Sequence, residues 1–367
     1  MSKRSGFATS RLLTRGSLLG LALCGLALAQ PGSIITFDIP GAGTGFRQGT
    51  TATSINAAGT ITGYYVDAGN FYHGFVRSPH GVFTVFDAPG TGTATLANSI
   101  NNEGAVTGYY IDAQGLAHGF VRSPSGVLTT FDAPPASGTS GTYAFSINDA
   151  DAITGFYLEG AVAYSFVRSA SGAFTPFGVP GAGGDGLNGT RAISINNAGS
   201  VAGSYSYNSP RYSVPDRGFV RAAGGFIAIF SAPGAGKSPD QGTQPLSIND
   251  TGAITGNYID AKGMTHGFVL SPTGIFTTID APFAPSSTTL PVSINDAGAI
   301  TGFYSIDSGL SHGFVRDAAG VFVTFNAPDA GGAPYSGTFA NSINDAGAIT
   351  GYFIDAKSAS HGFLRIP

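Results

Sequence analysis

The stretch from residue 99 to 112 reads Ser99-Ile-Asn-Asn-Glu-Gly-Ala-Val-Thr-Gly-Tyr-Tyr-Ile-Asp112, and close copies of it recur along the chain. Its opening tripeptide, Ser-Ile-Asn, occurs seven times at intervals of 45 to 53 residues. The copies begin at Ser54, Ser99, Ser146, Ser194, Ser247, Ser293 and Ser342. A recurring period of this length is typical of folds built by repeating one supersecondary unit.

Each repeat has the composition of a small antiparallel meander. Four runs of four to seven residues, rich in β-branched and aromatic types, alternate with Gly, Pro, Asn and Asp. The first turn has the form Asn-x-x-Gly, as at Asn101 and Gly104, where Gly fits a left-handed position. Each such turn offers at most one carboxylate, fewer than calcium requires, so we expect no metal there. The pattern predicts four strands per repeat and no helix.

The two ends of the chain share one repeat. The seventh repeat stops at 361–367 without its fourth run, and a matching run stands at 33–40, where Thr-Phe-Asp recurs as in 130–132. A closed propeller completes its last blade in this way and leaves no unpaired strand at the seam. We predict an all-β, seven-bladed β-propeller of four-stranded antiparallel blades over residues 30–367, closed by the N-terminal strand. A right-handed β-solenoid is the alternative.

The first 29 residues differ in character from the repeats. An apolar run, 17–28, ends in the small-x-small pattern at 27–29 and follows a basic start. The basic residues are Lys3, Arg4, Arg11 and Arg15. This predicts a secretory signal peptide over residues 1–29 and an extracellular or periplasmic protein, with a retained N-terminal anchor as the alternative. The only cysteine, Cys24, follows Leu23 where a lipobox has a small residue, and lipid anchoring at Cys24 stays open.

Charge and motif content exclude several classes of function. Without the leader the chain has 13 Lys and Arg against 21 Asp and Glu, a net charge of −8, which argues against nucleic acid and anionic membranes as partners. No phosphate loop, nucleophile elbow, zinc-helix motif or Cys/His cluster is present. We expect a monomer with no cofactor, no metal and no catalytic residue, and with no membrane span in the mature chain.

The repeat resembles the HAF extracellular repeat of bacteria. The resemblance rests on Ser-Ile-Asn-Asn-x-Gly-x-Val-x-Gly followed by His-x-Phe-Val-Arg, and it covers residues 54–365. This chain has His-Gly-Phe where the family name implies His-Ala-Phe, which suggests a closer approach of the backbone. The resemblance implies secretion and a repeat fold, and it implies no catalytic residues.

Five of the six histidines occupy one repeat position, and four of them have an aspartate six residues earlier. These pairs are Asp67–His73, Asp112–His118, Asp260–His266 and Asp355–His361. In the sixth repeat Asp307 stands five residues before His312. We interpret the pairs as structural contacts across a hairpin, with metal ligation or acid–base catalysis as the alternative. The Arg of Phe-Val-Arg is expected to pair with an acid on a neighbouring strand, such as Asp87 or Asp132.

Repeats three and four lack the Asp–His pair, and repeat four carries an insertion at 205–217. Because function often lies on loops held by a rigid scaffold, we predict a ligand-binding rim here. Its residues are Tyr207, Arg211, Tyr212, Arg217, Arg191 and Lys237. The alternative is a drifted blade with a tolerated loop.

Repetition without a convergent polar site favours a binding module over an enzyme. We predict a secreted, non-enzymatic repeat propeller that binds extracellular glycan or protein. One alternative is a propeller hydrolase or lyase acting on polysaccharide through carboxylates near the central channel or the repeat-four rim. The other is a structural surface protein without a small ligand. The identity of the ligand does not follow from the sequence.

Overall fold

A computed structural model describes residues 32–134, 141–160, 162–182, 189–206, 216–282 and 288–367. These residues form 28 strands, and no helix occurs among them. The prediction of an all-β chain is therefore confirmed. The strands fall into seven groups of four, and neighbours within each group pair antiparallel in the order in which they are given below.

Groups one to three follow the first three repeats. Group one is β2 (Gly49–Ile55), β3 (Ile61–Val66), β4 (Tyr72–Arg77) and β5 (Phe83–Phe86). Group two is β6 (Thr91–Ile100), β7 (Val106–Asp112), β8 (Ala117–Arg122) and β9 (Leu128–Phe131). Group three is β10 (Thr142–Ile147), β11 (Ile153–Glu159), β12 (Val162–Arg168) and β13 (Phe174–Phe177).

Groups four to six continue the pattern. Group four is β14 (Gly189–Ile195), β15 (Val201–Ser206), β16 (Arg217–Arg221) and β17 (Ile227–Phe230). Group five is β18 (Gly242–Ile248), β19 (Ile254–Ile259), β20 (Thr265–Leu270) and β21 (Phe276–Ile279). Group six is β22 (Thr288–Ile294), β23 (Ile300–Ser305), β24 (Ser311–Arg316) and β25 (Phe322–Phe325).

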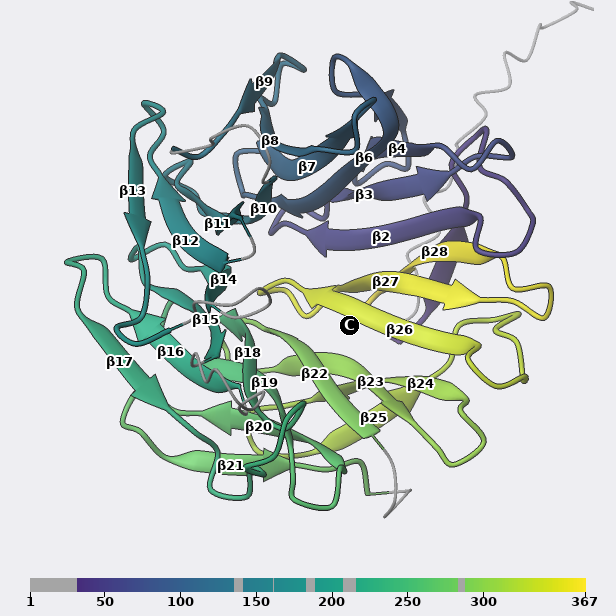
Figure 1. The fold of residues 1–367 in the computed structure, drawn as a ribbon. Coiled ribbons are helices and arrows are strands. Elements are labelled where there is room, and N and C mark those ends of the chain that lie inside the picture. Colours follow the sequence, from purple (N-terminus) through teal and green to yellow (C-terminus); the bar gives the residue numbers. More distant parts are fainter. Residues whose placement is uncertain (1–31, 135–140, 161, 183–188, 207–215, 283–287) are drawn as a thin grey trace, which may run out of the picture.

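Group seven joins the two ends of the chain. It contains β26 (Gly337–Ile343), β27 (Ile349–Ile354) and β28 (Ser360–Arg365), and its fourth strand is β1 (Ile34–Phe37). β1 pairs antiparallel with β28, from Ile34 opposite Arg365 to Phe37 opposite Gly362. The groups follow one another around a common centre, so that purple β2 lies beside yellow β27 and β28 (Figure 1). Single parallel bridges between groups merge them into sheets of 16, 8 and 4 strands.

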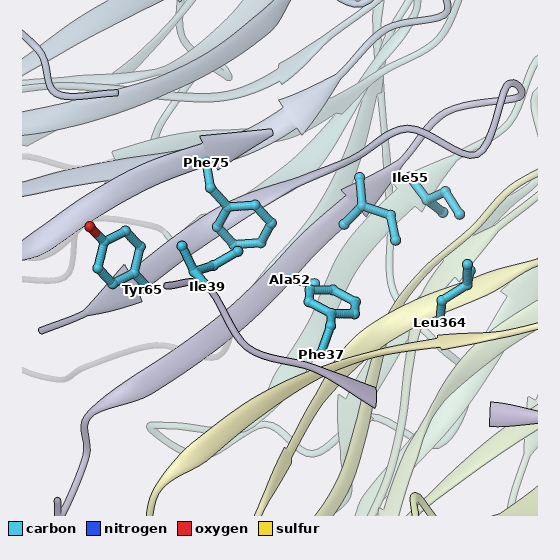
Figure 2. Close-up of a cluster of buried hydrophobic side chains, with 8 residues drawn as sticks. Phe37, Ile39, Ala52, Ile55, Tyr65, Phe75 and Leu364 are labelled. Atoms are coloured by element: carbon cyan, nitrogen blue, oxygen red, sulfur yellow. The ribbon is translucent and has the colours of Figure 1, made fainter. Parts of the chain in front are cut away.

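Phe37 shows why β1 belongs to group seven. Its ring covers Gly362, where a Cβ atom would lie 2.5 Å from the ring, and it packs edge-on against Phe75 of group one. Figure 2 shows Phe37 and Leu364 in one buried cluster with Ile55 and Phe75. The same arrangement recurs between neighbouring groups, for example where Phe86 covers Gly74 and meets Phe120. Phe37 of β1 thus occupies the position that the Phe of the fourth strand occupies in other groups, such as Phe86 in group one.

The arginines of Phe-Val-Arg also contact the preceding group. In five of the six, the guanidinium lies over a fourth-strand Phe at 4.7 to 5.2 Å, as Arg77 does over Phe37 and Arg122 over Phe86. The expected pairing of these arginines with Asp87 and Asp132 is wrong, because both carboxylates contact histidines instead. The arginine therefore joins neighbouring groups through cation–π packing.

The Ser-Ile-Asn tripeptides bond to one another around the centre. The Asn side chain donates from Nδ2 to the backbone oxygen of the Asn in the next repeat, at 2.8 to 3.1 Å, and the seventh returns to the first. The donors in order are Asn56, Asn101, Asn148, Asn196, Asn249, Asn295 and Asn344. The Ser hydroxyl accepts the backbone N–H of the Ile in the next repeat at 3.2 to 3.3 Å, and Ser342 accepts from Ile55.

Candidate functional site

A polar hollow of about 170 Å³ lies where the first turns of the repeats meet around the centre. The residue after each Asn contributes to its wall: Ala57, Asn102, Asp149, Asn197, Asp250, Asp296 and Asp345. In each consecutive pair from Ala57 to Asp345, the backbone N–H of one residue donates to the side chain of the next at 2.7 to 2.9 Å. These Asn and Asp side chains therefore add a second row of hydrogen bonds beside the ring of the tripeptides.

The carboxylates of this hollow also interact electrostatically. Burial raises the pKa of Asp296, and the charges of Asp250, Asp345 and Asp149 raise it further against an opposing backbone hydrogen bond. Among the residues that the structure describes, no group of three or more His, Cys, Asp or Glu side chains is arranged to hold a metal ion. The arrangement is suited to holding turns together and leaves one carboxyl group easier to protonate than an ordinary aspartate.

The paired aspartates and histidines lie at the periphery, and each such histidine contacts two acids. Nε2 faces the aspartate six residues earlier at 3.2 to 3.6 Å, and Nδ1 lies 2.8 to 3.0 Å from the aspartate after the fourth strand. The triplets are Asp67–His73–Asp87, Asp112–His118–Asp132, Asp260–His266–Asp280 and Asp355–His361–Asp38. In group six, Nδ1 of His312 lies 2.8 Å from Oδ1 of Asn326.

Two observations favour a structural role for these triplets. The first aspartate also caps the turn after it, as where Oδ1 of Asp67 accepts the N–H groups of Gly69 and Phe71. The imidazole stacks on the second-strand aromatic ring, as His73 does on Tyr65 at 4.8 Å. Each triplet thus holds one hairpin to its neighbouring strand, and the triplets are distributed over four groups.

The titration of His118 should reveal its two carboxylate contacts. Burial lowers its pKa, but hydrogen bonds with Asp132 and Asp112, together with their charges, raise the net value above 6.5. The stability from this histidine is present below pH 6.5 and fades as the pH rises through the folded pKa. A backbone hydrogen bond from Leu116 lowers the pKa of Asp112, so its contribution is present above pH 3.8 and fades in stronger acid.

We expect Asp132→Asn to lower the pKa of His118, because the substitution removes the charge beside Nδ1 and keeps the shape of the side chain. Asn326 beside His312 is a natural example of this arrangement. NMR titration of the His118 ring in both proteins measures the shift. An unchanged pKa in the variant would show that the carboxylate contact does not exist in solution.

The structure describes three of the six residues of the predicted repeat-four rim. Tyr207, Arg211 and Tyr212 lie outside the described residues. Arg191 packs its guanidinium 5.7 Å from the centre of the Phe156 ring, between groups three and four. Arg217 begins β16 and is exposed, as is Lys237 in the connector before group five. The rim stays a prediction.

A larger hollow, of about 460 Å³, opens between groups seven and one. Five aromatic side chains line it: Phe46, Tyr64, Tyr72, Tyr335 and Tyr352. Phe46 and Tyr335 stand on the connectors that precede β2 and β26, and they are 68% and 85% exposed. Burial raises the pKa of Tyr352 to about 12 and also raises the pKa of Tyr64, so both phenols stay neutral hydrogen-bonding groups. We call these residues and their neighbours the seam hollow.

The seam hollow exists because one repeat position carries a small residue. Between other groups, the second strand meets a large first-strand side chain of the next group, as Tyr109 meets Tyr143 and Phe303 meets Phe339. The first-strand position is occupied by Leu96, Tyr143, Arg191, Gln244, Leu290 and Phe339 in groups two to seven. In group one it is Thr51, which lines the hollow together with Tyr352. Threonine does not fill the space that the larger side chains occupy.

Three of the described residues that line the seam hollow have unusual backbone conformations. Arg47, Tyr335 and Ser358 have φ values of 60°, 65° and 65°, a region that costs free energy for most residues other than Gly. Both connectors are held by hydrogen bonds, including Arg47 N–H to the Ser358 oxygen at 3.0 Å and Tyr335 N–H to the Gly309 oxygen at 2.9 Å. Strained residues held in this way are found more often at functional sites than elsewhere.

The seam hollow was not predicted from the sequence. The connectors at 41–48 and 328–336 resemble the other Gly- and Pro-rich connectors, and Thr51 is unremarkable until the strand register is known. The available signal was the pair of exposed aromatic residues, Phe46 and Tyr335, on connectors that are otherwise small and polar.

Comparisons with known proteins bear on the fold. No protein-family model matches the chain, and no curated protein matches it in sequence. Virginiamycin B lyase from Staphylococcus aureus is similar in structure, with a TM-score of 0.57 and 10% identity over 91% of this chain and 99% of the lyase. A streptogramin B lyase has a TM-score of 0.55 and 10% identity, covering 91% of this chain and 98% of its own.

The β-propeller domain of the Trilobed protease from Pyrococcus furiosus is similar at a TM-score of 0.59, with 8% identity over 88% of this chain and 93% of that one. That propeller has an open velcro topology, whereas β1 pairs with β28 here. At these identities the similarity concerns the fold alone, and the chain has the all-β fold of the propellers.

The part of the chain that the structure describes contains no helix long and apolar enough to cross a membrane.

Proposed function

We propose that this protein is a secreted, closed seven-bladed propeller that acts as a glycan-binding module through the seam hollow. Closure is supported by the pairing of β1 with β28 and by the tripeptide bonds that return from Asn344 to Asn56. Secretion is supported by the predicted leader at 1–29 and by the resemblance to HAF extracellular repeats. The net charge of −8 after the leader is removed also suits a soluble protein.

The observation that carries the binding function is the aromatic lining of the seam hollow. A binding site is typically a concave, largely apolar pocket with a few polar groups that orient the ligand. Here two exposed rings, Phe46 and Tyr335, stand at the rim, and Tyr64 and Tyr352 present neutral hydroxyls deeper in the hollow. The faces of a sugar ring can stack on such aromatic rings, while its hydroxyls bond to the phenols.

A lyase or hydrolase acting on polysaccharide is the second candidate. Two of the similar structures are lyases, and Asp296 in the central hollow has a raised pKa that suits an acid catalyst. Asp296 is also engaged in structure, because its Oδ1 accepts the N–H of Asp250. We rank the enzyme second for this reason, and a structural surface protein without a small ligand third.

The test is a glycan array followed by calorimetry with the best ligand. Tyr335→Ala and Phe46→Ala should each weaken binding at least tenfold, about 1.4 kcal/mol. Phe226→Ala is the matched control, because Phe226 is 75% exposed but lies far along the chain in group four. It should bind like the unmodified protein.

Three results would point elsewhere. Unchanged binding in Tyr335→Ala and Phe46→Ala would contradict the seam hollow as the site. If a swap of 211–217 for the short turn of repeat two abolished binding, the site would be the repeat-four rim with Arg191, Arg217 and Lys237. Cleavage of an array ligand that is lost in Asp296→Asn would favour the enzyme.

A further inference from the structure

The seam hollow contains one basic side chain among the described residues that line it, Arg47. The side chain is exposed, and its guanidinium lies 5.0 Å from the centre of the Phe46 ring. None of the ion pairs among the described residues includes Arg47. A guanidinium placed in this way keeps its N–H donors available to a ligand.

Asp355, the one acidic side chain among the described residues of this lining, is engaged within group seven. Its Oδ1 accepts the N–H groups of Lys357 and Ala359 at 2.8 and 2.9 Å, and its Oδ2 lies 3.5 Å from Nε2 of His361. Burial raises its pKa, but those backbone hydrogen bonds and His361 bring the net value below the usual one. Asp355 thus shapes the turn beside the hollow, and Arg47 is left as the charged group that a ligand can meet.

We propose that the ligands of this protein are acidic glycans whose sugar rings carry carboxylates. This inference rests on the proposed glycan-binding function. The planar fork of Arg47 matches a carboxylate in a bidentate manner, and the rings of Phe46 and Tyr335 receive the adjoining sugar faces. A neutral sugar would leave the charge of Arg47 without a counterpart in the complex.

Because the chain as a whole is acidic, only the short-range contact with Arg47 can favour an acidic ligand. At −8 without the leader, the protein as a whole repels a polyanion, so long-range attraction does not assist capture. Discrimination between charged and neutral sugars must then come from Arg47 itself. Lys357 is a matched control, because it is an exposed cation on the neighbouring turn of group seven and does not line the hollow.

The experiment compares oligosaccharides that differ only in charge. Hexagalacturonate is paired with its fully methyl-esterified form, and an oligomannuronate with its carboxyl-reduced form, by calorimetry with the full chain at fixed ionic strength. We expect the charged member of at least one pair to bind tenfold or more tightly. Arg47→Gln should abolish this preference, whereas Lys357→Gln should keep it.

Each contrary outcome has a separate meaning. Equal binding of charged and neutral members, with both weakened by Tyr335→Ala, would overturn the acidic class and leave the glycan-binding function standing. Tighter binding of a sulfated, uronate-free oligosaccharide than of either uronate would overturn the carboxylate. A preference retained in Arg47→Gln would overturn the role of this residue. Absence of binding to every glycan would overturn the proposed function.

Discussion

Removing residues 30–40 should destabilise the protein far more than removing residues 1–29. Removal of residues 30–40 takes away β1, with the buried side chains of Phe37 and Ile39, and leaves β28 with an unpaired edge. Loss of the Phe37 side chain alone is expected to lower the free energy of unfolding by about 3–5 kcal/mol. Denaturant unfolding and thermal melting of the two truncated chains measure the difference.

Point variants distinguish the effect of losing the β1 contacts from the effect of shortening the chain. Phe37→Ala removes the contacts with Phe75 and Arg77, and Gly362→Val places a side chain against the Phe37 ring. Both should be strongly destabilising. Ile35→Ala is the control on the same strand, because Ile35 is 40% exposed and its loss should cost little. If the chain that lacks residues 30–40 had the same melting temperature as the chain that starts at residue 30, β1 would have no role in stability.

The sequence predicted the strands and the pairing of the two ends well. The repeat of about 48 residues marks each group, and the Thr-Phe-Asp at 36–38 could be aligned with 130–132 because short strands in equivalent repeats share one register. His-Gly-Phe indicated a close backbone approach, and the structure shows a Phe ring over the Gly of each such motif except in group five, where Pro291 lies nearest Gly267. Local patterns of this kind follow directly from spacing.

Contacts between repeats were harder to predict. The Asn of Ser-Ile-Asn was interpreted as a turn residue, and its Oδ1 does accept an N–H within its own turn, as Asn56 does from Thr60. Its Nδ2 bonds to the Asn101 oxygen of the next repeat, 45 residues away, and no spacing within one repeat reveals that partner. For the same reason Asp87 was assigned to an arginine, whereas the third-strand histidine lies nearer in the folded sheet.

The candidate site was the least predictable part, because it arises from what one position lacks. Repeats reinforce the expectation that equivalent positions behave alike, and Thr51 departs from the larger residues found at the other six. A hollow forms only because Thr51 faces Tyr352 across the seam. That juxtaposition depends on β-strand register and on the meeting of the two chain ends.

Replacing Asn249 by Ala should show how much the central ring contributes to stability. Asn249 is buried, and its Nδ2 donates to the Asn295 oxygen at 2.8 Å while its Oδ1 accepts the N–H of Ala253 at 2.8 Å. Truncation leaves the buried Ala253 N–H without its acceptor, at about 1–3 kcal/mol, and removes one of the two donors to the Asn295 oxygen, which keeps the N–H of Gly298. We expect a loss of roughly 1–4 kcal/mol in the free energy of unfolding. Asn326→Ala removes an exposed amide at the periphery and should change stability by less than about 0.5 kcal/mol.

Asn249→Asp tests the hydrogen bond between repeats separately. The substitution keeps the acceptor for Ala253 but turns a carboxylate oxygen toward the Asn295 oxygen. Repulsion and burial should raise the pKa of the new carboxyl in the folded state, so the protonated form, which can donate, is favoured. The penalty relative to the unmodified protein should therefore be small below about pH 4 and grow as the pH rises above it. A penalty that does not vary with pH, or an Asn249→Ala protein as stable as the parent, would show that the ring of asparagines does not hold the repeats together.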